Sequence, residues 1–404
     1  MSALALDSDD EEYETAVLAA AVVVMGAENA RLHRAETRLP SHRYLCRPQL
    51  LPEPRCDMPW QVLYASRNDR TYITTMGINT ETFDYILSKG FRQRWEQSTI
   101  PCTDANPNGL PRLGRRSLNA EGALGLICHH LCSSMSDTAL QQIFALVPST
   151  VSRYRNFAQT ILCATLRQVP EAEIAWWKTA EECEMDSEMV RLRHPLLESA
   201  MGTIDGLNLA MAMSDGPELE NATFNGWLHG HFTSCVLVFA PRGLIKACVL
   251  NAPGSWHDAK VARPIYDKLR NKTPDSYYFV ADTAFPRGDA SIAGRIQAPL
   301  KSGQQVPGDR EEREAVLARN RQLLSFRQTA EWGMRLLRVG FARLRLPLDI
   351  NDPEGRVELL EVCYCLCNLR TELVGINEIC TDGEIWADFE NVLFCDLQQC
   401  DRVA

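Results

Sequence analysis

The chain has 404 residues, of which 45% are hydrophobic and 23% are charged, with a formal net charge of −10. This composition fits an ordinary globular protein with a sizeable core, and the length leaves room for two or three domains. The negative net charge by itself argues against a nucleic-acid partner, but the acidic residues are concentrated near the two ends of the chain, so this argument does not extend to its middle part.

The N-terminal residues, 1–75, show no sustained hydrophobic period, and we expect an acidic disordered tip followed by an irregular arm. The first 40 residues contain eight acidic residues and three Arg. The apolar run 16–25 is too short for a membrane span, and its acidic flank is wrong for a signal peptide. A short terminal helix and no membrane association are therefore predicted.

A helical region is predicted over residues 76–180. Thr80 caps a first helix that extends to residue 91, and a loop rich in Pro, Asn and Gly follows. Three further helices are expected at 117–132, 136–145 and 149–166. The first of them contains His129 and His130 between two cysteines, but no second pair of zinc ligands lies nearby. We therefore predict a buried apolar helix there.

The last two of these helices have the outline of a helix-turn-helix. A short helix and a tight turn precede a longer helix, for which Ser149 is a good N-cap. In such motifs the N-terminal part of the second helix meets base edges. The DNA-contact candidates are Thr150, Ser152 and Arg153. A helical bundle that joins two domains has the same outline, and this alternative stays open.

From about residue 199 the pattern changes to alternating strands and helices. Apolar strands are expected around Asp205, at 231–240 and 243–252, at 277–282 and at 291–300. Helices are expected at 255–271 and 310–346. This order indicates an α/β fold with a mixed sheet flanked by helices.

Three acids stand out in this region. Asp205 lies in an apolar strand, where a carboxylate is costly unless it binds a metal or a cation. Asp282 ends a strand, and ligands of α/β sheets bind at such carboxyl ends. Glu331 lies on the long helix. Converging carboxylates are what hard divalent cations require, and paired cations cleave phosphodiesters.

The long helix also carries positive charge. Residues 313–345 contain eight Arg and two Glu. At about 100° per residue, Arg335, Arg338 and Arg345 share the line of Glu331, beside an apolar stripe. Arg335 and Arg338 are therefore candidates for phosphate contacts, although a solvated helix face would have the same pattern.

The C-terminal part of the chain is acidic, with thirteen Asp or Glu and three Arg in residues 349–404. An acidic tail is predicted for 371–404. The chain contains 15 cysteines, an odd number, which sit in apolar runs such as Cys363–Cys367. Free buried thiols in a reducing compartment are expected.

Four local sequences, in this order, resemble Harbinger-type (PIF/Harbinger) transposase-derived nucleases of the DDE superfamily. They are IDGLNL, APGSWHDAKV, ADTAFP and AEWGMRLL…FARL, and CYCLCNLR is similar to a later helix of the family. The resemblance covers about residues 199–370. Three departures are the Leu207–Asn208 pair in place of Thr-His, Ala284–Phe285 in place of Gly-Tyr, and Trp332 in place of Arg.

The resemblance implies an RNase H-like nuclease domain at 199–370, preceded by the helix-turn-helix. It implies a catalytic and metal-binding triad of Asp205, Asp282 and Glu331 that holds Mg²⁺ or Mn²⁺. The family's His-Asp pair falls on His257 and Asp258, so Asp258 is either a further metal ligand or a helix N-terminal residue favoured by the dipole.

The expected function is metal-dependent cleavage of DNA by a transposase-like endonuclease in the nucleus. Family resemblance adds a separate Myb-like DNA-binding protein as a partner, and the sequence leaves a homo-oligomer open. A second hypothesis is a domesticated DNA-binding protein that keeps the transposase fold and is catalytically impaired. A third is a metal-dependent hydrolase of small phosphate esters, against which the helix-turn-helix and the arginine-bearing helix count.

Overall fold

The structure is a computed structural model that describes residues 17, 20–29, 58–101, 109–213, 216–285, 292, 294–301, 303–306 and 308–375. It divides into Met1–Leu50 and Leu51–Ala404. In the first unit, residues 20–29 form an exposed helix, as expected. The acidic tip and most of the acidic tail lie outside the described residues. Among the described helices, none has the length and apolar character needed to cross a membrane.

The second unit begins with a helical region. Its elements are α2 (Pro59–Ser66), α3 (Asp69–Met76), α4 (Thr80–Ile86), η2 (Leu87–Phe91), α5 (Arg92–Gln97), η3 (Leu113–Arg115), α6 (Ala120–Cys132), α7 (Asp137–Phe144), α8 (Pro148–Leu166), η4 (Pro170–Ala172) and α9 (Ala180–Arg193). The expectation of an irregular arm up to residue 75 is wrong for α2 and α3, because both helices bury aromatic side chains, Trp60 and Tyr72, in the core.

Local capping determines where these helices begin. Side chains of Asn79, Asn119 and Ser136 accept backbone N–H groups at the starts of α4, α6 and α7. Thr80 was expected to cap α4, but it is the first helical residue. Ser149 is likewise not the cap of α8, because Pro148 begins that helix with its fixed φ and missing N–H.

The rest of the unit is built on a six-stranded sheet. Its elements are β1 (Ala200–Ala210), α10 (Pro217–Thr223), β2 (Phe224–Asn225), β3 (Gly230–Phe239), β4 (Ile245–Pro253), α11 (Asp258–Val261), α12 (Arg263–Asn271), β5 (Tyr278–Ala281), β6 (Ile296–Gln297), α13 (Arg310–Gly340), η5 (Ala342–Arg345) and α14 (Pro353–Leu373). The mixed α/β sheet flanked by helices is confirmed.

The sheet is mixed in direction. Strand β3 pairs antiparallel with both β1 and β4, whereas β1, β5 and β6 run parallel to one another. Strand β2 adds a short antiparallel pair at the beginning of β3. This arrangement is consistent with the RNase H-like fold that the sequence resemblance implies.

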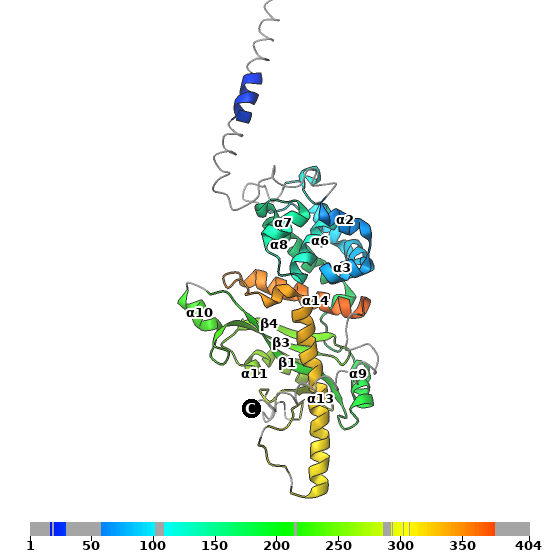
Figure 1. Ribbon diagram of the computed structural model, residues 1–404. Coiled ribbons are helices and arrows are strands. Elements are labelled where there is room, and N and C mark those ends of the chain that lie inside the picture. Colours follow the sequence, from blue (N-terminus) through cyan, green and yellow to red (C-terminus); the bar gives the residue numbers. More distant parts are fainter. Residues whose placement is uncertain are drawn as a thin grey trace, which may run out of the picture. The chain divides into compact units, whose positions relative to one another are not determined.

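Each face of the sheet has its own apolar cluster. Leu207 and Leu209 of β1 pack with Met334 and Leu337 of α13, and Ile204 packs with α12 on the opposite face. This alternation follows the two-residue period of a strand. In Figure 1, α13 crosses the strands of the sheet, and α14 lies between the sheet and the helical region.

Helix α14 closes the outer edge of β4. The Asn368 side chain accepts the N–H of Ile245 at 2.8 Å, and its amide donates to the Ile245 and Glu173 carbonyls at 3.0 Å each. One amide thus occupies the position of a neighbouring strand at Ile245. Cysteines of α14 are buried and free, as expected, and all nine cysteines in the described residues are free thiols.

Two expected helices differ from the sequence pattern, one because it is interrupted and the other because it ends earlier. The helix expected at 255–271 is divided into α11 and α12, and Pro264 lies in the first turn of α12. Helix α13 ends at Gly340, and Arg345 belongs to the separate η5. Arg345 therefore does not continue the line of Glu331, because the 100° increment stops at the end of the helix.

Candidate active site

Asp205 and Asp282 lie on neighbouring parallel strands. Ile204 pairs with Ala281, so each aspartate is the next residue beyond that pair, on strands about 4.8 Å apart. Asp205 points to the same face as Leu207, which α13 covers. Tyr278 and Val280 also pack on α13, and Asp282 continues their alternation. The two carboxylates therefore share the α13 face at the end of β5.

Burial gives Asp205 unusual electrostatics. The pKa of Asp205 is raised to about 6, mainly by loss of solvent and in smaller part by the nearby carboxylates of Asp282 and Glu331. The backbone N–H of Gly206, which donates to Asp205 Oδ1 at 2.8 Å, acts in the opposite direction, as does Arg327. Asp205 therefore lies within electrostatic reach of both acids that the sequence singles out.

Asp282 is oriented by its own turn. The Ala284 N–H donates to Asp282 Oδ1 at 2.8 Å, which closes a local turn just after β5. This leaves the other carboxylate oxygen free of that bond. The family's Gly-Tyr is Ala284–Phe285 here, and Phe285 is buried beneath the sheet in the cluster with α12. Pro286 of the same motif lies outside the described residues.

Glu331 is bound by an arginine that the sequence analysis missed. Arg327, one helical turn earlier on α13, forms an ion pair with Glu331 Oε1, and its charge also lowers the pKa of Asp205. An Arg four residues before a Glu on one helix face is a recognisable pattern and could have been found. Arg327 thus contacts Glu331 directly and acts electrostatically on Asp205.

Asp258 joins these acids from the other face of the sheet. A Cβ built on Gly206 would lie 2.4 Å from Asp258 Oδ2, so only glycine leaves room for this carboxylate. Burial raises the pKa of Asp258, Asp282 raises it further, and His257 lowers it. Asp258 begins α11, where the helix dipole favours a negative charge. We call Asp205, Asp258, Asp282 and Glu331 the acid cluster.

The candidate phosphate contacts on α13 differ from each other. Arg335 is exposed on the helix. Arg338 donates to the Asn208 carbonyl at 2.8 Å and thereby ties α13 to β1. Both side chains are exposed on α13, and a phosphate contact of either arginine stays a prediction.

The candidate DNA contacts on α8 lie at its N-terminal end. Thr150, Ser152 and Arg153 are partly exposed there, and Val151 is buried. Helices α7 and α8 pack together, and Arg155 of α8 bonds Asp137 of α7 at 2.8 Å. The helix pair is therefore present as expected, and its contact with DNA stays a prediction.

The acid cluster has the chemistry but not the closed geometry of a metal site. All of its donors are carboxylate oxygens, which hard divalent cations prefer. Across the described residues, however, no three His, Cys, Asp or Glu side chains are arranged to hold one ion. The Arg327–Glu331 pair accounts for part of this, since it directs Glu331 toward a guanidinium.

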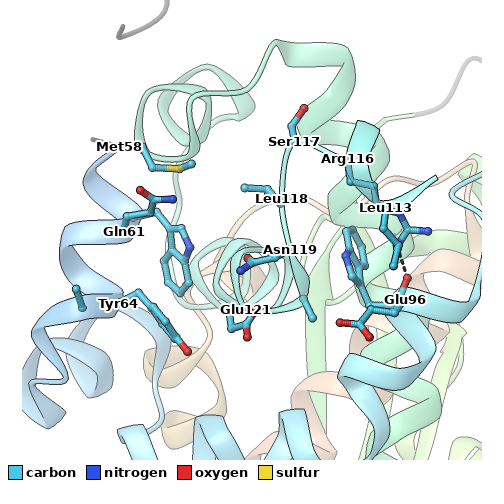
Figure 2. A pocket seen from close by; sticks show the side chains of 14 residues that line it. Met58, Gln61, Tyr64, Glu96, Leu113, Arg116, Ser117, Leu118, Asn119 and Glu121 are labelled. Atoms are coloured by element: carbon cyan, nitrogen blue, oxygen red, sulfur yellow. Dashed lines mark hydrogen bonds between the residues drawn. The ribbon is translucent and has the colours of Figure 1, made fainter. Parts of the chain in front are cut away.

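A separate cavity of about 540 Å³ lies in the helical region, away from the acid cluster (Figure 2). Helices α2, α5 and α6 contribute to its walls. Glu121 faces it and pairs with Arg92 through Oε1 at 2.5 Å, while its buried Oε2 has no hydrogen-bond partner. Trp60 and Trp95 also line it, but both rings are packed in the core and offer no open face.

Comparison with known proteins supports the assignment of the sheet region. Residues 204–368 match the family described as a DDE superfamily endonuclease, from the strand of Asp205 to Asn368 of α14. This part of the chain is therefore similar to DDE superfamily endonucleases, and the similarity suggests a transposase-like nuclease function. No curated protein matches the chain, and neither does a solved structure.

Proposed function

We propose that the protein is a divalent-metal-dependent DNA endonuclease related to Harbinger-type transposases, with Asp205, Asp282 and Glu331 as its catalytic carboxylates. The observation that carries this proposal is the electrostatic proximity of the three acids where the middle of β1 lies beside the end of β5. It falls inside the part of the chain that matches DDE endonucleases. Like charges brought together at a partly buried site favour the binding of a cation.

The residues fit Mg²⁺ or Mn²⁺ by the chemistry of their donors. Asp205, Asp282 and Glu331 would hold the metal, and Asp258 is a fourth candidate ligand that approaches from the α11 face. When bound, the metal supplies a Lewis acid for attack on a phosphodiester and for stabilisation of the leaving oxygen.

The chain's own residues then have distinct tasks. Asp282 is held in one orientation by the Ala284 N–H, and Asp205 by the Gly206 N–H. Glu331 must exchange its bond with Arg327 for a metal. The guanidinium that this exchange releases lies next to the acids, where it can bind a phosphate oxygen of DNA.

DNA would reach the site along positively charged helices. Arg335 is exposed on the face of α13 that carries Glu331, and Arg153 lies at the exposed end of α8. Both are proposed phosphate contacts, and Thr150 and Ser152 are proposed base contacts. A nuclear location, a Myb-like partner and a homo-oligomer belong to the same proposal.

The test is nicking of supercoiled DNA by the full chain with Mg²⁺ or Mn²⁺. Asp205→Asn, Asp282→Asn and Glu331→Gln should each abolish nicking and leave the fold intact, because each removes a charge that the metal requires. Asp267→Asn is the matched control, since Asp267 is an exposed acid on α12 that pairs with Arg270. Nicking that survives Asp282→Asn would refute the assignment.

A second candidate function is DNA binding without cleavage. The Arg327–Glu331 pair favours it, because a guanidinium already compensates an acid that the metal would need. DNA binding that is equal with Mn²⁺ and with EDTA, together with no nicking, would support this function. Hydrolysis of bis-p-nitrophenyl phosphate without any DNA binding would instead indicate a hydrolase of small phosphate esters.

A further inference from the structure

An exposed aromatic surface lies next to the loop that carries Asp258. Trp227 is 89% exposed, and Trp256 is 40% exposed. Phe224 and Leu228, beside Trp227 in sequence, are each 44% exposed. Single exposed apolar residues need no explanation, but a contiguous group points to an interaction. We call Trp227 and Trp256 the aromatic platform.

Hydrogen bonds hold the two parts of the platform together. The Asn225 side chain accepts the N–H groups of Trp227 and Leu228 at 3.0 and 3.1 Å, and it donates to the Gly254 carbonyl at 2.9 Å. The Ser255 N–H donates to the Ala222 carbonyl at 3.2 Å. The turn that carries Trp227 is therefore fixed to the loop that carries Trp256.

The same loop leads directly to the acid cluster. Asp258 follows Trp256 by two residues, and its carboxylate lies against Gly206, the neighbour of Asp205. Helices α10 and α11, which flank the platform, both pack against β3 (Figure 1). The loop that places Asp258 beside Gly206 thus also carries Trp256. A DNA strand with a phosphate at the acid cluster would therefore lie near the aromatic platform.

Positive charge accompanies the platform. The Lys260 ammonium lies 3.6 Å from the centre of the Trp256 ring, which fixes a cation on one face of that indole. Arg263, three residues later, is also exposed. The combination of an exposed indole with fixed cations suits a nucleic-acid strand, which offers flat bases and phosphates at regular intervals. An apolar protein partner would not pair with these positive charges.

We propose that the aromatic platform stacks on an unpaired nucleobase next to the phosphodiester at the acid cluster, with Lys260 on an adjacent phosphate. The proposal rests on the proposed nuclease function, because it takes DNA as the ligand. Trp227 supplies the open stacking face, and Trp256 holds Lys260 in place. The protein would thereby engage DNA whose bases are unstacked near the point of cleavage.

The test compares two single strands of about twelve nucleotides and equal charge, oligo-dT and an abasic strand, bound by the full chain in EDTA. Trp227→Ala should weaken oligo-dT binding on the order of 5- to 100-fold and leave abasic binding unchanged, and Trp227→Phe should retain most of the affinity. Lys260→Ala should weaken both strands alike, because it removes a phosphate contact. Leu192→Ala is the control at a distant, 78% exposed apolar residue.

Two results would overturn the proposal. One is a Trp227→Ala variant that binds both strands as the wild type does, and the other is equal loss for both strands. If Trp227→Ala changes only sedimentation of the protein, the surface is a contact between protein chains. Binding in EDTA does not use the acids, so it tests the platform alone. The nuclease assignment is tested separately, by whether Asp282→Asn still nicks DNA. Failure of one proposal can therefore be distinguished from failure of the other.

Discussion

The helical region and the sheet region both bury titratable side chains, with opposite consequences. In α6, burial lowers the pKa of His129 to about 4 and of His130 to about 3. At the sheet, burial raises the pKa of Asp205 to about 6 and also raises that of Asp258. The cause is the same, because a low-dielectric surrounding disfavours the charged form of any group.

The neighbours make the difference. Arg155 and Arg343 contribute to the lowered pKa of His130, so this imidazole stays neutral in a core that needs no ligand. The acids of the sheet instead gather beside one another, with Arg327 as a cation close by. Burial of single groups gives an inert interior, whereas burial of Asp205 near other acids leaves like charges whose repulsion a cation would relieve.

The largest effect on stability should come from adding a side chain at one of two tightly packed glycines, one in each region. A Cβ on Gly125 would lie 2.2 Å from the Trp60 ring, and one on Gly333 would lie 2.5 Å from the Phe239 ring. Valine at either position should lower the free energy of unfolding by about 3 kcal/mol through overpacking. Urea denaturation measures both losses.

The two valine variants should differ in nicking per folded molecule. Gly333 lies two residues from Glu331, so Gly333→Val should displace this acid and reduce nicking beyond the loss of stability. Gly125→Val, in the helical region, should leave nicking per folded molecule unchanged. Equal activity of the two variants at matched folded fractions would contradict the separation of the regions.

A smaller effect of opposite sign is expected for Asp205→Asn without metal. The folded-state pKa of about 6 lies above the ordinary 3.8, so this group favours folding at low pH and loses that contribution as pH rises through 6. Asparagine should therefore stabilise the protein by about 2 kcal/mol at neutral pH and by much less near pH 4. Urea midpoints in EDTA across this range provide the measurement, with Asp267→Asn as control.

The smallest effect concerns the buried imidazoles. The pKa of His130 falls from 6.5 to about 3 on folding, so its contribution to stability is present above pH 6.5 and is lost on acidification. His130→Gln should reduce the stability loss between pH 7.5 and 5.5 by about 1 kcal/mol. Urea midpoints at the two pH values provide the measurement, and an equal loss in His130→Gln and the wild type would contradict this contribution.

The elements that carry the acids were predictable because each has a strong local pattern. Strands β1 and β5 are apolar runs, and Glu331 lies on a long periodic helix. The contact of Asp258 with Gly206 was not predictable, since it depends on how α11 packs across the sheet. No spacing along the chain encodes that approach.

Other differences have local causes. Pro148 at the start of α8 follows a general rule for proline at the first helical position, and it outweighs Ser149 as a candidate cap. Helices α2 and α3 are too short to show a period, and single aromatic anchors, Trp60 and Tyr72, hold them in place. Such anchoring depends on distant partners, which one chain segment does not reveal.

The position of α14 has a consequence for how this protein could change in evolution. Its Asn368 binds both β4 and the Glu173 carbonyl, and the helix packs on α8 as well as on the sheet. The two regions are therefore not independent modules that recombination could exchange at the boundary of the matched domain. A protein that evolves from this one would have to keep both regions together. Otherwise it would need, in place of α14, another helix that packs on both α8 and the sheet.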